Sequence, residues 1–598
     1  MGIRKHAKKT FAALLAASTL TSAAATFNVM ADNSDTINYN AGTMEEIPLV
    51  EAGSAVSIID AKGYEEGAYA EWTAVDGADG YNVYCDGVQL DSMLIRQYSG
   101  YFRADAVGIK SGNHTLKIVP TKNGTEMTSA AAKINVTSTS YDRSGFCFAK
   151  NSITGGSGIG AYNDDGTLKS GAVVLYVTED TKNTIKMDVK ISSSKTQTCT
   201  GISEILKAMQ KGAETRPVAI RIIGKVTIDG INGSGDTNNL LLKASSENSP
   251  IKNITVEGIG EDAVCYGWGV RCNRAQSIEI RNLAVMLFGD DGIALETANY
   301  NIWVHDNDIF YGSAGSDADQ VKGDGSMDLK DDSKYITVSY NHFWDSGKMS
   351  LCGMKSETGE NWISYHHNWF DHSDSRHPRI RTMSVHVYNN YYDGNAKYGV
   401  GVTMGGNAFV ENNYFRNCNY PMMISMQGSD TISGGTFSGE SGGMIKSFGN
   451  VMSGHKSYIT YQTNNKDFDA YEASSRDEKV PESIKCVSGA TSYNNFDTNS
   501  SVMYSYTPDS ADAVPSKVME LAGRLNGGDF EWEFNDSVDD KDYSVNKELM
   551  NKITSYQSGV IAIGSGFQSG SSITTTTSTT ATSKSSSSNT TVKTTTAS

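Results

Sequence analysis

The chain has 598 residues, in which 68 Asp and Glu outnumber 51 Lys and Arg, so its formal net charge is −17. This acidity argues against nucleic acid as the main partner. The length exceeds what one compact globule usually holds, so we expect several domains or an elongated repeat. Abundant glycine (59), scarce proline (9) and many short aromatic and Asn-rich runs favour strands and tight turns over helices.

Residues 1–31 have the pattern of a secretory signal peptide. Basic residues from Arg4 to Lys9 precede an apolar run of small residues, and "VMA" before Asp32 offers a cleavage site. Ser and Thr interrupt the apolar run, which argues against a membrane anchor, and no later segment has the length and apolarity of a membrane span. We therefore expect a secreted, extracellular protein.

The cysteines give little information about structure. Export permits disulfides, but the eight cysteines are scattered without CxxC pairs, so they specify no connectivity and do not indicate a zinc site. Cys265 and Cys272 are the closest pair, and the sequence leaves a bridge between them open.

The two ends of the mature chain differ from its middle. Residues 32–142 contain alternating runs with Gly and Asp turns, such as "YAEWTAVDGADGYNVYCDGVQL" and "HTLKIVPTKNG", which predict a small β-sandwich. The run from Trp72 through "GYNVYCDG" resembles a fibronectin type III module, which implies a docking spacer more readily than a sugar-binding site. Residues 566–598 form a low-complexity Ser/Thr tail, which we expect to tether the protein to a cell surface or a multi-enzyme assembly.

Residues 143–565 contain a recurring unit, seen in "IWVHDNDIF", "ITVSYNHF", "ISYHHNWF", "VHVYNNYY", "AFVENNYF" and "IKSFGN". The shared asparagines are Asn307, Asn341, Asn368, Asn390, Asn413 and Asn450. Successive gaps between them are 34, 27, 22, 23 and 37 residues. Spacings that share a minimum near 22 residues, and exceed it by varying amounts, are typical of a solenoid that has loops inserted into some coils.

Stacking explains this pattern, because a single strand–turn–strand unit cannot bury its apolar face alone. An Asn at the same turn of each coil can hydrogen-bond to its neighbours above and below, and it tolerates a left-handed backbone. We therefore predict an all-β fold, a right-handed parallel β-helix preceded by the β-sandwich. The helical apolar period of "TGISEILKAMQKGAE" predicts a helix that covers the open end of the stack.

Two acidic segments stand at predicted strand starts. "FGDDGIALE" holds Asp290 and Asp291, and "KGDGSMDLKDD" holds Asp324 and Asp328. Neighbouring coils of a solenoid place equivalent residues about 4.8 Å apart, so we expect Asp291, Asp324 and Asp328 to converge on one face. Converging carboxylates repel each other unless a cation joins them, and ligands made only of oxygen favour Ca²⁺.

A cationic group follows on the next segments. Lys348 stands in "WDSGKMSLCG", and Arg376 and Arg381 flank Pro378 in "SDSRHPRIR". Isolated arginines mostly cover surface, but a Lys and two Arg facing carboxylates on adjacent coils indicate an anionic substrate bridged to Ca²⁺. His377, beside Arg376, is a second candidate for a base, although neighbours along a strand point to opposite faces.

From about Gly145 to Gln557 the sequence resembles the pectate lyases of polysaccharide lyase family 1. The matching segments are "GDDGIAL…NIWVHDNDIF", "GDGSMDLKDDSKYITVSYNHFWDSGKMSLCG", "WISYHHNWFDHSDSRHPRIR…VHVYNNYY" and "TSYNNFDTNSS". The spacing from Asn341 to Lys348 fits the family pattern without gaps. The fold that this resemblance implies is the same parallel β-helix.

The resemblance also implies roles for individual residues. The implied Ca²⁺ ligands are Asp291, Asp324 and Asp328. Asp290 is an alternative to Asp291, because the "DDG" cluster departs from the family pattern by an extra residue. The implied catalytic residue is Arg376. The implied substrate-binding residues are Lys348 and Arg381.

The activity that the resemblance implies is cleavage of α-1,4-linked polygalacturonate, which is de-esterified pectin. Cleavage is a Ca²⁺-dependent β-elimination that gives 4,5-unsaturated oligogalacturonates. The substrate proton at C5 is too weakly acidic to be lost unaided, so Ca²⁺, Lys348 and Arg381 would stabilise an enolate-like intermediate. Arginine is an unusual base, but these neighbouring cations favour loss of its proton, so we expect activity that rises into alkaline pH.

Three other functions compete with this one. A pectin lyase acting on methyl esters needs no cationic group, and Asp324 and Asp328 argue against it. A β-helical polygalacturonase is suggested by "GDDGIA", but hydrolysis needs further acid and base motifs that we do not find. A non-catalytic pectin-binding β-helix would not need Lys348, Arg376 and Arg381 together. We expect a monomer; endo or exo action and tolerance of methyl esters stay open.

Overall fold

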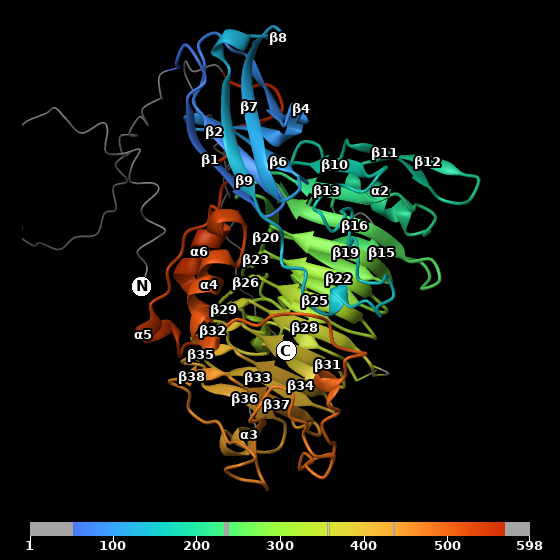
Figure 1. Cartoon of the computed structure of the whole chain (residues 1–598), viewed down its shortest axis with the longest axis vertical. Helices are drawn as coiled ribbons and strands as arrows, with labels where there is room; N and C mark the ends of the chain where they lie inside the picture. The colour runs from blue at the N-terminus through green and yellow to red at the C-terminus, as the bar shows by residue number, and fades with distance from the viewer. Residues whose placement is uncertain (1–51, 232–237, 356, 358, 435–436, 569–598) are drawn as a thin grey trace, which may run out of the picture. The chain divides into compact units, whose positions relative to one another are not determined.

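The computed structural model describes residues 52–231, 238–355, 357, 359–434 and 437–568. These residues form an antiparallel sandwich followed by a stack of parallel coils (Figure 1). The expected signal peptide, residues 1–31, and most of the expected tail, residues 566–598, lie outside the described residues. None of the helices in the described part of the chain is long and apolar enough to span a membrane.

The sandwich consists of two antiparallel sheets. The first has, in spatial order, β1 (Ile58–Tyr64), β2 (Gly67–Trp72), β6 (Tyr101–Val107), β5 (Ile95–Tyr98) and β40 (Ala562–Ile563). The second has β4 (Val88–Gln89), β3 (Gly80–Cys85), β7 (Gly112–Lys122) and β8 (Thr125–Glu126), with β9 (Ala132–Ser138) also paired to β7. Trp72 and Phe102 stack with ring centroids 6.1 Å apart in the apolar core that the sheets enclose.

One strand of the sandwich comes from the far end of the chain. β40 pairs with β5 through Ala562 and Gln97, and the ring of Phe567 meets Phe102 edge-on at 5.3 Å. The C-terminal segment therefore returns to the N-terminal sandwich and completes it. The likeness of this sandwich to a fibronectin type III module remains a prediction.

Three parallel sheets form the coils, and successive strands fall to each sheet in turn. The 11-stranded sheet has β10 (Val173–Val177), β13 (Val218–Ile222), β16 (Ile251–Gly258), β19 (Ala275–Arg281), β22 (Tyr300–His305), β25 (Lys334–Ser339), β28 (Trp362–His366), β31 (Ser384–Tyr388), β34 (Asn407–Glu411), β37 (Met444–Phe448) and β39 (Tyr471–Glu472). The 9-stranded sheet has β14 (Lys225–Thr227), β17 (Val264–Tyr266), β20 (Ala284–Met286), β23 (Asp308–Ile309), β26 (His342–Trp344), β29 (Trp369–Asp371), β32 (Tyr391–Asp393), β35 (Tyr414–Arg416) and β38 (Val451–Ser453). The 8-stranded sheet has β15 (Asn239–Lys243), β18 (Gly269–Asn273), β21 (Ile293–Glu296), β24 (Met327–Leu329), β27 (Leu351–Cys352), β30 (Arg379–Arg381), β33 (Tyr398–Thr403) and β36 (Tyr420–Ile424). The predicted parallel β-helix is confirmed.

Apolar side chains fill the interior of the coils. Phe343, Phe370, Tyr392 and Phe415 occupy equivalent places on successive coils, with ring centroids 5.7, 4.8 and 4.1 Å apart. Each is fully buried, and burial of such a side chain contributes about 1.5–3 kcal/mol to stability. The row forms because the strand alternation turns one aromatic residue of every coil inward.

The predicted asparagine ladder is present. Each Asn side-chain amide donates to the Oδ1 of the next Asn, at 2.9, 3.0, 2.9, 3.0 and 3.0 Å from Asn307 to Asn450. One detail of the prediction is wrong. The left-handed backbone lies at the residue before each Asn, for example Tyr340 at φ 53° and Asn389 at φ 51°. The ladder Asn itself is not left-handed, and its side chain hydrogen-bonds to the Asn of the next coil.

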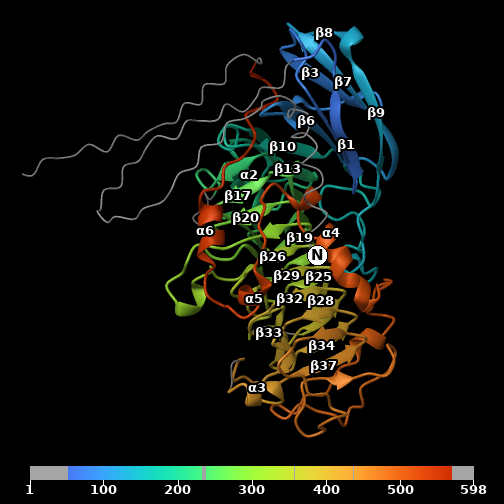
Figure 2. The same ribbon diagram turned by 90° about the vertical axis from the view of Figure 1, so that its left-hand side faces the viewer.

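Helices cover parts of the stack. A hairpin of β11 (Lys186–Lys190) and β12 (Thr196–Thr200) leads into α2 (Ile202–Met209), whose Ile205 and Leu206 join the core at the first coils, where a helix was expected. The C-terminal helices are α4 (Val514–Leu521), α5 (Asp536–Asp539) and α6 (Lys547–Thr554), and α3 (Ser429–Ile432) follows β36. Val518 packs with Tyr391 and Leu549 with Trp344, so α4 and α6 cover the 9-stranded sheet (Figures 1 and 2).

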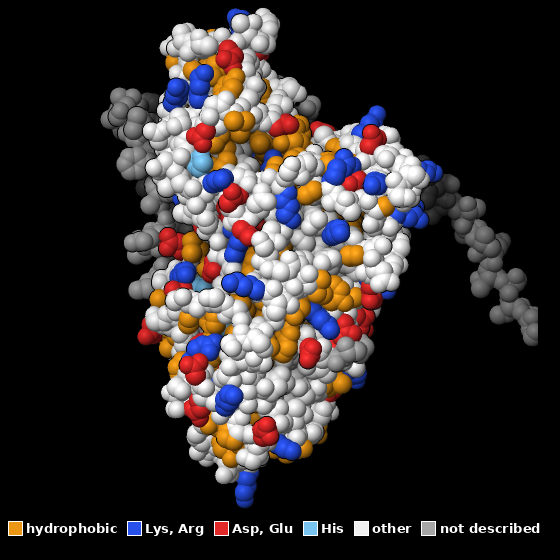
Figure 3. Space-filling view, turned by 45° about the vertical axis from the view of Figure 1, so that its right-hand side comes forward, with side chains coloured by type: hydrophobic (Ala, Val, Ile, Leu, Met, Phe, Trp, Pro, Cys, Tyr) orange, Lys and Arg blue, Asp and Glu red, His pale blue; other side chains and the backbone are white. Residues whose placement is uncertain are grey.

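The eight cysteines all lie among the described residues, where they are buried and form no disulfide, so Cys265 and Cys272 are not bridged. On the face shown in Figure 3, Lys and Arg side chains are interspersed with Asp and Glu side chains.

Candidate active site

The predicted site residues lie on four successive strands of the 8-stranded sheet, β21, β24, β27 and β30, or just before them, with Asp328 inside β24 and Arg381 at the end of β30. They are Asp290, Asp291, Asp324, Asp328, Lys348, Arg376 and Arg381. Parallel pairing sets their register, with Ala294 opposite Asp328 and Leu351 opposite Arg379. We call this group the strand-start edge. Its residues span 92 positions of sequence at most, yet stacking brings them onto adjacent coils.

The acidic half of the strand-start edge is a carboxylate cluster of Asp290, Asp291, Asp324 and Asp328. Ligand oxygens of the first three all lie within 4.8 Å of one another. Asp291 is 2% exposed, and its Oδ1 accepts a hydrogen bond from the Gly325 amide at 3.0 Å. Burial, and then the neighbouring Asp328 carboxylate, raise the pKa of Asp291 to about 8. Asp291 is therefore the inward-facing carboxylate of the "DDG" pair, and the side chain of Asp290 beside it is 48% exposed.

Lys330 belongs to this cluster and was missed by the sequence analysis. Its Nζ lies 2.7 Å from Asp291 Oδ2 and 3.2 Å from Asp328 Oδ2. Burial opposes its charge, but Asp328 and Asp291 raise the pKa of Lys330. Strand alternation could have found it, because Lys330 follows Asp328 by two positions and so shares its face.

The donor chemistry of the carboxylate cluster fits Ca²⁺. The ligand atoms are all carboxylate oxygens, the type that Ca²⁺ prefers. Burial and the neighbouring Asp328 carboxylate both disfavour the charged form of Asp291, and a bound cation would offset this. A glycine is required at Gly325, because a Cβ there would collide with the Asp328 carboxylate.

Lys348 links the acidic and basic halves of the strand-start edge. Its Nζ lies 2.6 Å from Asp324 Oδ1 and 3.4 Å from Asp319 Oδ2, and its residue is 7% exposed. Burial alone would raise the pKa of Asp324, but the hydrogen bond from Lys348 lowers it below its usual value.

Arg381 is held by an acidic residue that the sequence analysis did not find. Arg381 donates to Glu440 from Nε at 2.9 Å and from Nη2 at 3.1 Å, and Arg379 donates to the same carboxylate at 3.2 Å. Burial opposes this charge, but Arg381 and Ser438 lower the pKa of Glu440 to about 2. Glu440 lies 59 residues from Arg381 in sequence, between β36 and β37. No periodicity in the sequence connects the two.

Arg376 differs from the other cations, because its guanidinium makes no hydrogen bond or ion pair with any residue that the structure describes. Its backbone is left-handed, at φ 67°, and its carbonyl accepts from the Ser350 amide at 2.8 Å. His377 instead faces inward: its Nδ1 meets the Tyr398 carbonyl at 2.8 Å and its Nε2 meets Ser373 Oγ at 2.7 Å. His377 is thus unavailable to a substrate at this edge.

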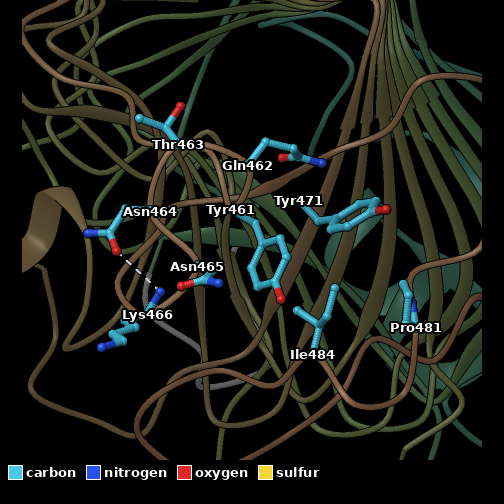
Figure 4. Close-up of a pocket in the computed structure, with 9 residues that line it drawn as sticks. All are labelled: Tyr461, Gln462, Thr463, Asn464, Asn465, Lys466, Tyr471, Pro481 and Ile484. Carbon is cyan, nitrogen blue, oxygen red and sulfur yellow. Dashed lines mark hydrogen bonds between the residues drawn. The ribbon is translucent and has the colours of Figure 1, made fainter.

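A surface hollow of about 710 Å³ lies elsewhere on the chain (Figure 4). Its lining residues are Tyr461, Gln462, Thr463, Asn464, Asn465, Lys466, Tyr471, Pro481 and Ile484. None of these belongs to the strand-start edge, and the hollow offers no carboxylate or arginine, so it is not the candidate active site.

The fold and the strand-start edge define a parallel β-helix protein in which a cluster of oxygen ligands adjoins a row of cations. A sequence model of the family described as pectate lyase matches residues 176–526, more than half of the chain. The chain therefore belongs to the pectate lyase family.

Two curated proteins and one solved structure are similar to this chain. The chain is 32% identical over 232 residues to a pectate trisaccharide-lyase of Bacillus licheniformis, covering 38% of this chain and 64% of that protein, which is less than two thirds. It is 31% identical over 283 residues to pectate lyase 3 of Pectobacterium carotovorum, covering 46% of this chain and 67% of that protein. The solved pectate lyase Bsp165PelA of Bacillus sp. N165, in complex with trigalacturonate, matches with a TM-score of 0.43 at 22% identity, covering 64% of this chain and 98% of that one.

Proposed function

We propose that this chain is a secreted pectate lyase that cleaves α-1,4-linked polygalacturonate by β-elimination with Ca²⁺, giving 4,5-unsaturated oligogalacturonates. The observation that carries the proposal is the guanidinium of Arg376, which has no partner among the residues that the structure describes and lies on the same edge as Lys348, Arg381 and the carboxylate cluster. Family membership supports it, as do relatives named pectate trisaccharide-lyase and pectate lyase 3.

Lys348 and Arg381 bind the substrate carboxylates in this proposal. Both already hold carboxylates of the chain itself, those of Asp324 and Glu440. The Glu440 carboxylate receives two hydrogen bonds from Arg381, which is how an arginine binds a galacturonate carboxylate. Substrate therefore takes the place of Glu440 at Arg381.

Asp291, Asp324 and Asp328, with Asp290 beside them, would hold Ca²⁺, and the chemistry that the ion supplies when bound is neutralisation of a substrate carboxylate. Arg376 in its neutral form accepts the proton from C5. The C–H electron pair becomes the C4–C5 double bond as the bond from C4 to the glycosidic oxygen breaks. The leaving oxygen takes a proton from solvent. The fixed charges of Lys348 and Arg381 stabilise the negative charge that develops during this transfer.

The rest of the proposal concerns the whole chain. The signal pattern of residues 1–31 supports export, and the Ser/Thr composition of residues 566–598 supports a tether. We assign residues 32–142 to a spacer module and residues 143–565 to the catalytic β-helix of a monomer. β40 is the part of this catalytic segment that returns to the spacer.

The test is incubation of the protein with polygalacturonate, with added Ca²⁺ or with a chelator. Growth of near-UV absorbance that depends on Ca²⁺ supports elimination, because the unsaturated product absorbs there. New reducing ends without this absorbance would instead indicate a hydrolase. Binding without any new ends would indicate a pectin-binding protein.

A further inference from the structure

A pair of buried histidines lies on the outer face of the 11-stranded sheet, away from the strand-start edge. His366 ends β28 and His367 follows it, and they are 0% and 2% exposed. Their Nδ1 atoms face each other at 3.0 Å, with the ring planes 87° apart. The proposed pectate lyase activity uses neither ring.

Hydrogen bonding at the other ring nitrogens fixes where the protons are. His366 Nε2 meets the Ser144 carbonyl at 3.3 Å, and His367 Nε2 meets Asp509 Oδ2 at 2.8 Å. A carbonyl and a carboxylate only accept, so each Nε2 carries a hydrogen. In the neutral rings both Nδ1 atoms then present lone pairs, and two lone pairs at this distance repel unless a cation lies between them.

A third candidate ligand lies beside the two rings. A carboxylate oxygen of Asp142 and one ring nitrogen of each histidine all lie within 4.8 Å of one another. The Ser144 amide donates to Asp142 Oδ1 at 3.1 Å and the Tyr340 hydroxyl donates to Oδ2 at 3.3 Å, so this carboxylate is positioned. Asp142 is exposed, so this side of the site meets solvent.

Stacked rings hold both imidazoles in place. Tyr340 stacks on His367 at 4.6 Å with an interplanar angle of 3°, and Tyr388 stacks on His366 at 4.8 Å. Burial lowers the pKa of His366 to about 3 and lowers that of His367, so both rings favour the neutral form that binds metals.

We propose that Asp142, His366 and His367 form a binding site for a divalent transition metal of the zinc type. Two imidazoles and a carboxylate suit Zn²⁺, and a tetrahedral ion with usual Zn–N bonds would place the two nitrogens about 3.3 Å apart. The carboxylate of Asp509 and the carbonyl of Ser144 orient the rings from behind, as acceptors do in known metal sites.

The site joins segments that are distant in sequence. Asp142 belongs to the segment after β9, which continues into a 3₁₀ turn (Phe146–Phe148) that packs on β22, β25 and β28 (Figure 1). Asp509 belongs to the segment before α4 and also accepts from Lys517 at 2.6 Å. A bound ion would therefore fasten the segment that enters the β-helix onto the middle of the stack.

Another cluster with a histidine shows the contrast. His372, Asp536 and Asp540 also bring ligand atoms together. There, Arg416 donates to both oxygens of Asp540, at 2.9 and 2.7 Å. A cationic side chain already supplies the positive charge, whereas the residues described around Asp142 place no Lys or Arg in a salt bridge with its carboxylate.

The test uses the full chain, freed of metals by chelator and returned to chelator-free buffer with excess Ca²⁺ to saturate the carboxylate cluster. Co²⁺ is then added while visible absorption is followed, and Zn²⁺ is added to displace it. We expect intense tetrahedral-type bands that saturate near one equivalent and vanish with Zn²⁺. Co²⁺ should bind at least about tenfold more weakly to Asp142→Asn, and the double variant His366→Gln, His367→Gln should show no bands.

Asp142→Asn changes an exposed side chain, so it keeps the test valid if the double variant fails to fold. His455→Gln, at an exposed histidine outside the site, is the matched control and should behave as the unaltered chain. Absence of bands in the unaltered chain, or equal bands in Asp142→Asn, would overturn the proposal. A proton shared between the two Nδ1 atoms would then explain their contact at 3.0 Å. Failure of the lyase assay would not affect this result, because the readout is spectroscopic.

Discussion

Asp328 and Arg376 hold consecutive residues of the coil that lies between them. Asp328 Oδ1 accepts from the Leu351 amide at 2.8 Å, and the Arg376 carbonyl accepts from the Ser350 amide at 2.8 Å. The proposed metal ligand and the proposed base therefore share one strand start, that of β27. Their separation is fixed by backbone pairing and not by flexible side chains alone.

The first prediction concerns Asp328→Asn. The amide oxygen can still accept from Leu351, so the fold should persist, but loss of a negative ligand should weaken Ca²⁺ binding about tenfold or more. Calorimetric titration with Ca²⁺ measures the affinity, and circular dichroism checks the fold. Asp477→Asn, at a side chain that is 89% exposed, is the control. An unchanged Ca²⁺ titration would show that Asp328 is not a ligand.

The second prediction concerns Glu440→Gln. Removing this charge frees Arg381 for a substrate carboxylate, so KM for polygalacturonate should fall roughly two- to tenfold with little change in kcat. Steady-state kinetics at fixed Ca²⁺ measure both constants, with exposed Glu482→Gln as control. A rise in KM would mean that Glu440 positions Arg381 for substrate instead of competing with it.

The third prediction concerns the asparagine ladder. Asn390→Ala removes the acceptor of the Asn368 amide at 3.0 Å and of its side chain at 2.9 Å, and both donors are buried. Each buried donor left unpaired costs about 1–3 kcal/mol. The thermal midpoint should fall by several degrees, whereas exposed Asn465→Ala should leave it unchanged. Equal midpoints for the two variants would mean that the ladder adds no stability.

The fourth prediction concerns pH and His372. Burial opposes the charged ring, but hydrogen bonds to Asp371 at 2.7 Å and the contact with Asp540 at 3.1 Å raise the pKa of His372 to about 10. An unfolded histidine titrates near 6.5. Since the folded pKa is the higher one, this stabilisation is complete below about pH 6.5 and is lost as the pH rises through about 10.

Urea unfolding at pH 6 and pH 10 measures this effect. The stability advantage of the unaltered chain over His372→Gln should be largest at pH 6 and should shrink by pH 10. An advantage that is the same at both values would show that His372 is not charged in the folded chain.

The sequence alone allowed the coil and the strand-start edge to be predicted, because both depend on local spacing. The Asn spacing identified the stacked turns, and stacking then places Asp291, Asp324 and Asp328 on adjacent strands. Even here the backbone detail was wrong. The ladder Asn was expected to have the left-handed backbone. The structure instead places that backbone at the preceding residue, and the side-chain amide of the ladder Asn points along the stack to the next Asn.

Contacts between distant segments were not predictable in this way. Glu440 reaches Arg381 from the segment between β36 and β37, and β40 reaches β5 across most of the chain. Nothing in the local period of either segment indicates its partner. Lys330 is different, because alternation with Asp328 was present in "MDLK" and was overlooked.

The most direct test of the proposed lyase is formation of near-UV-absorbing product from polygalacturonate by the unaltered chain and by Arg376→Ala. We expect product from the unaltered chain only with Ca²⁺, and a loss of about 10²–10⁴ in rate for Arg376→Ala with Ca²⁺ binding and fold intact. Product formation at the original rate by Arg376→Ala, or reducing ends without the absorbance, would contradict the assignment of Arg376 as the base of a β-elimination.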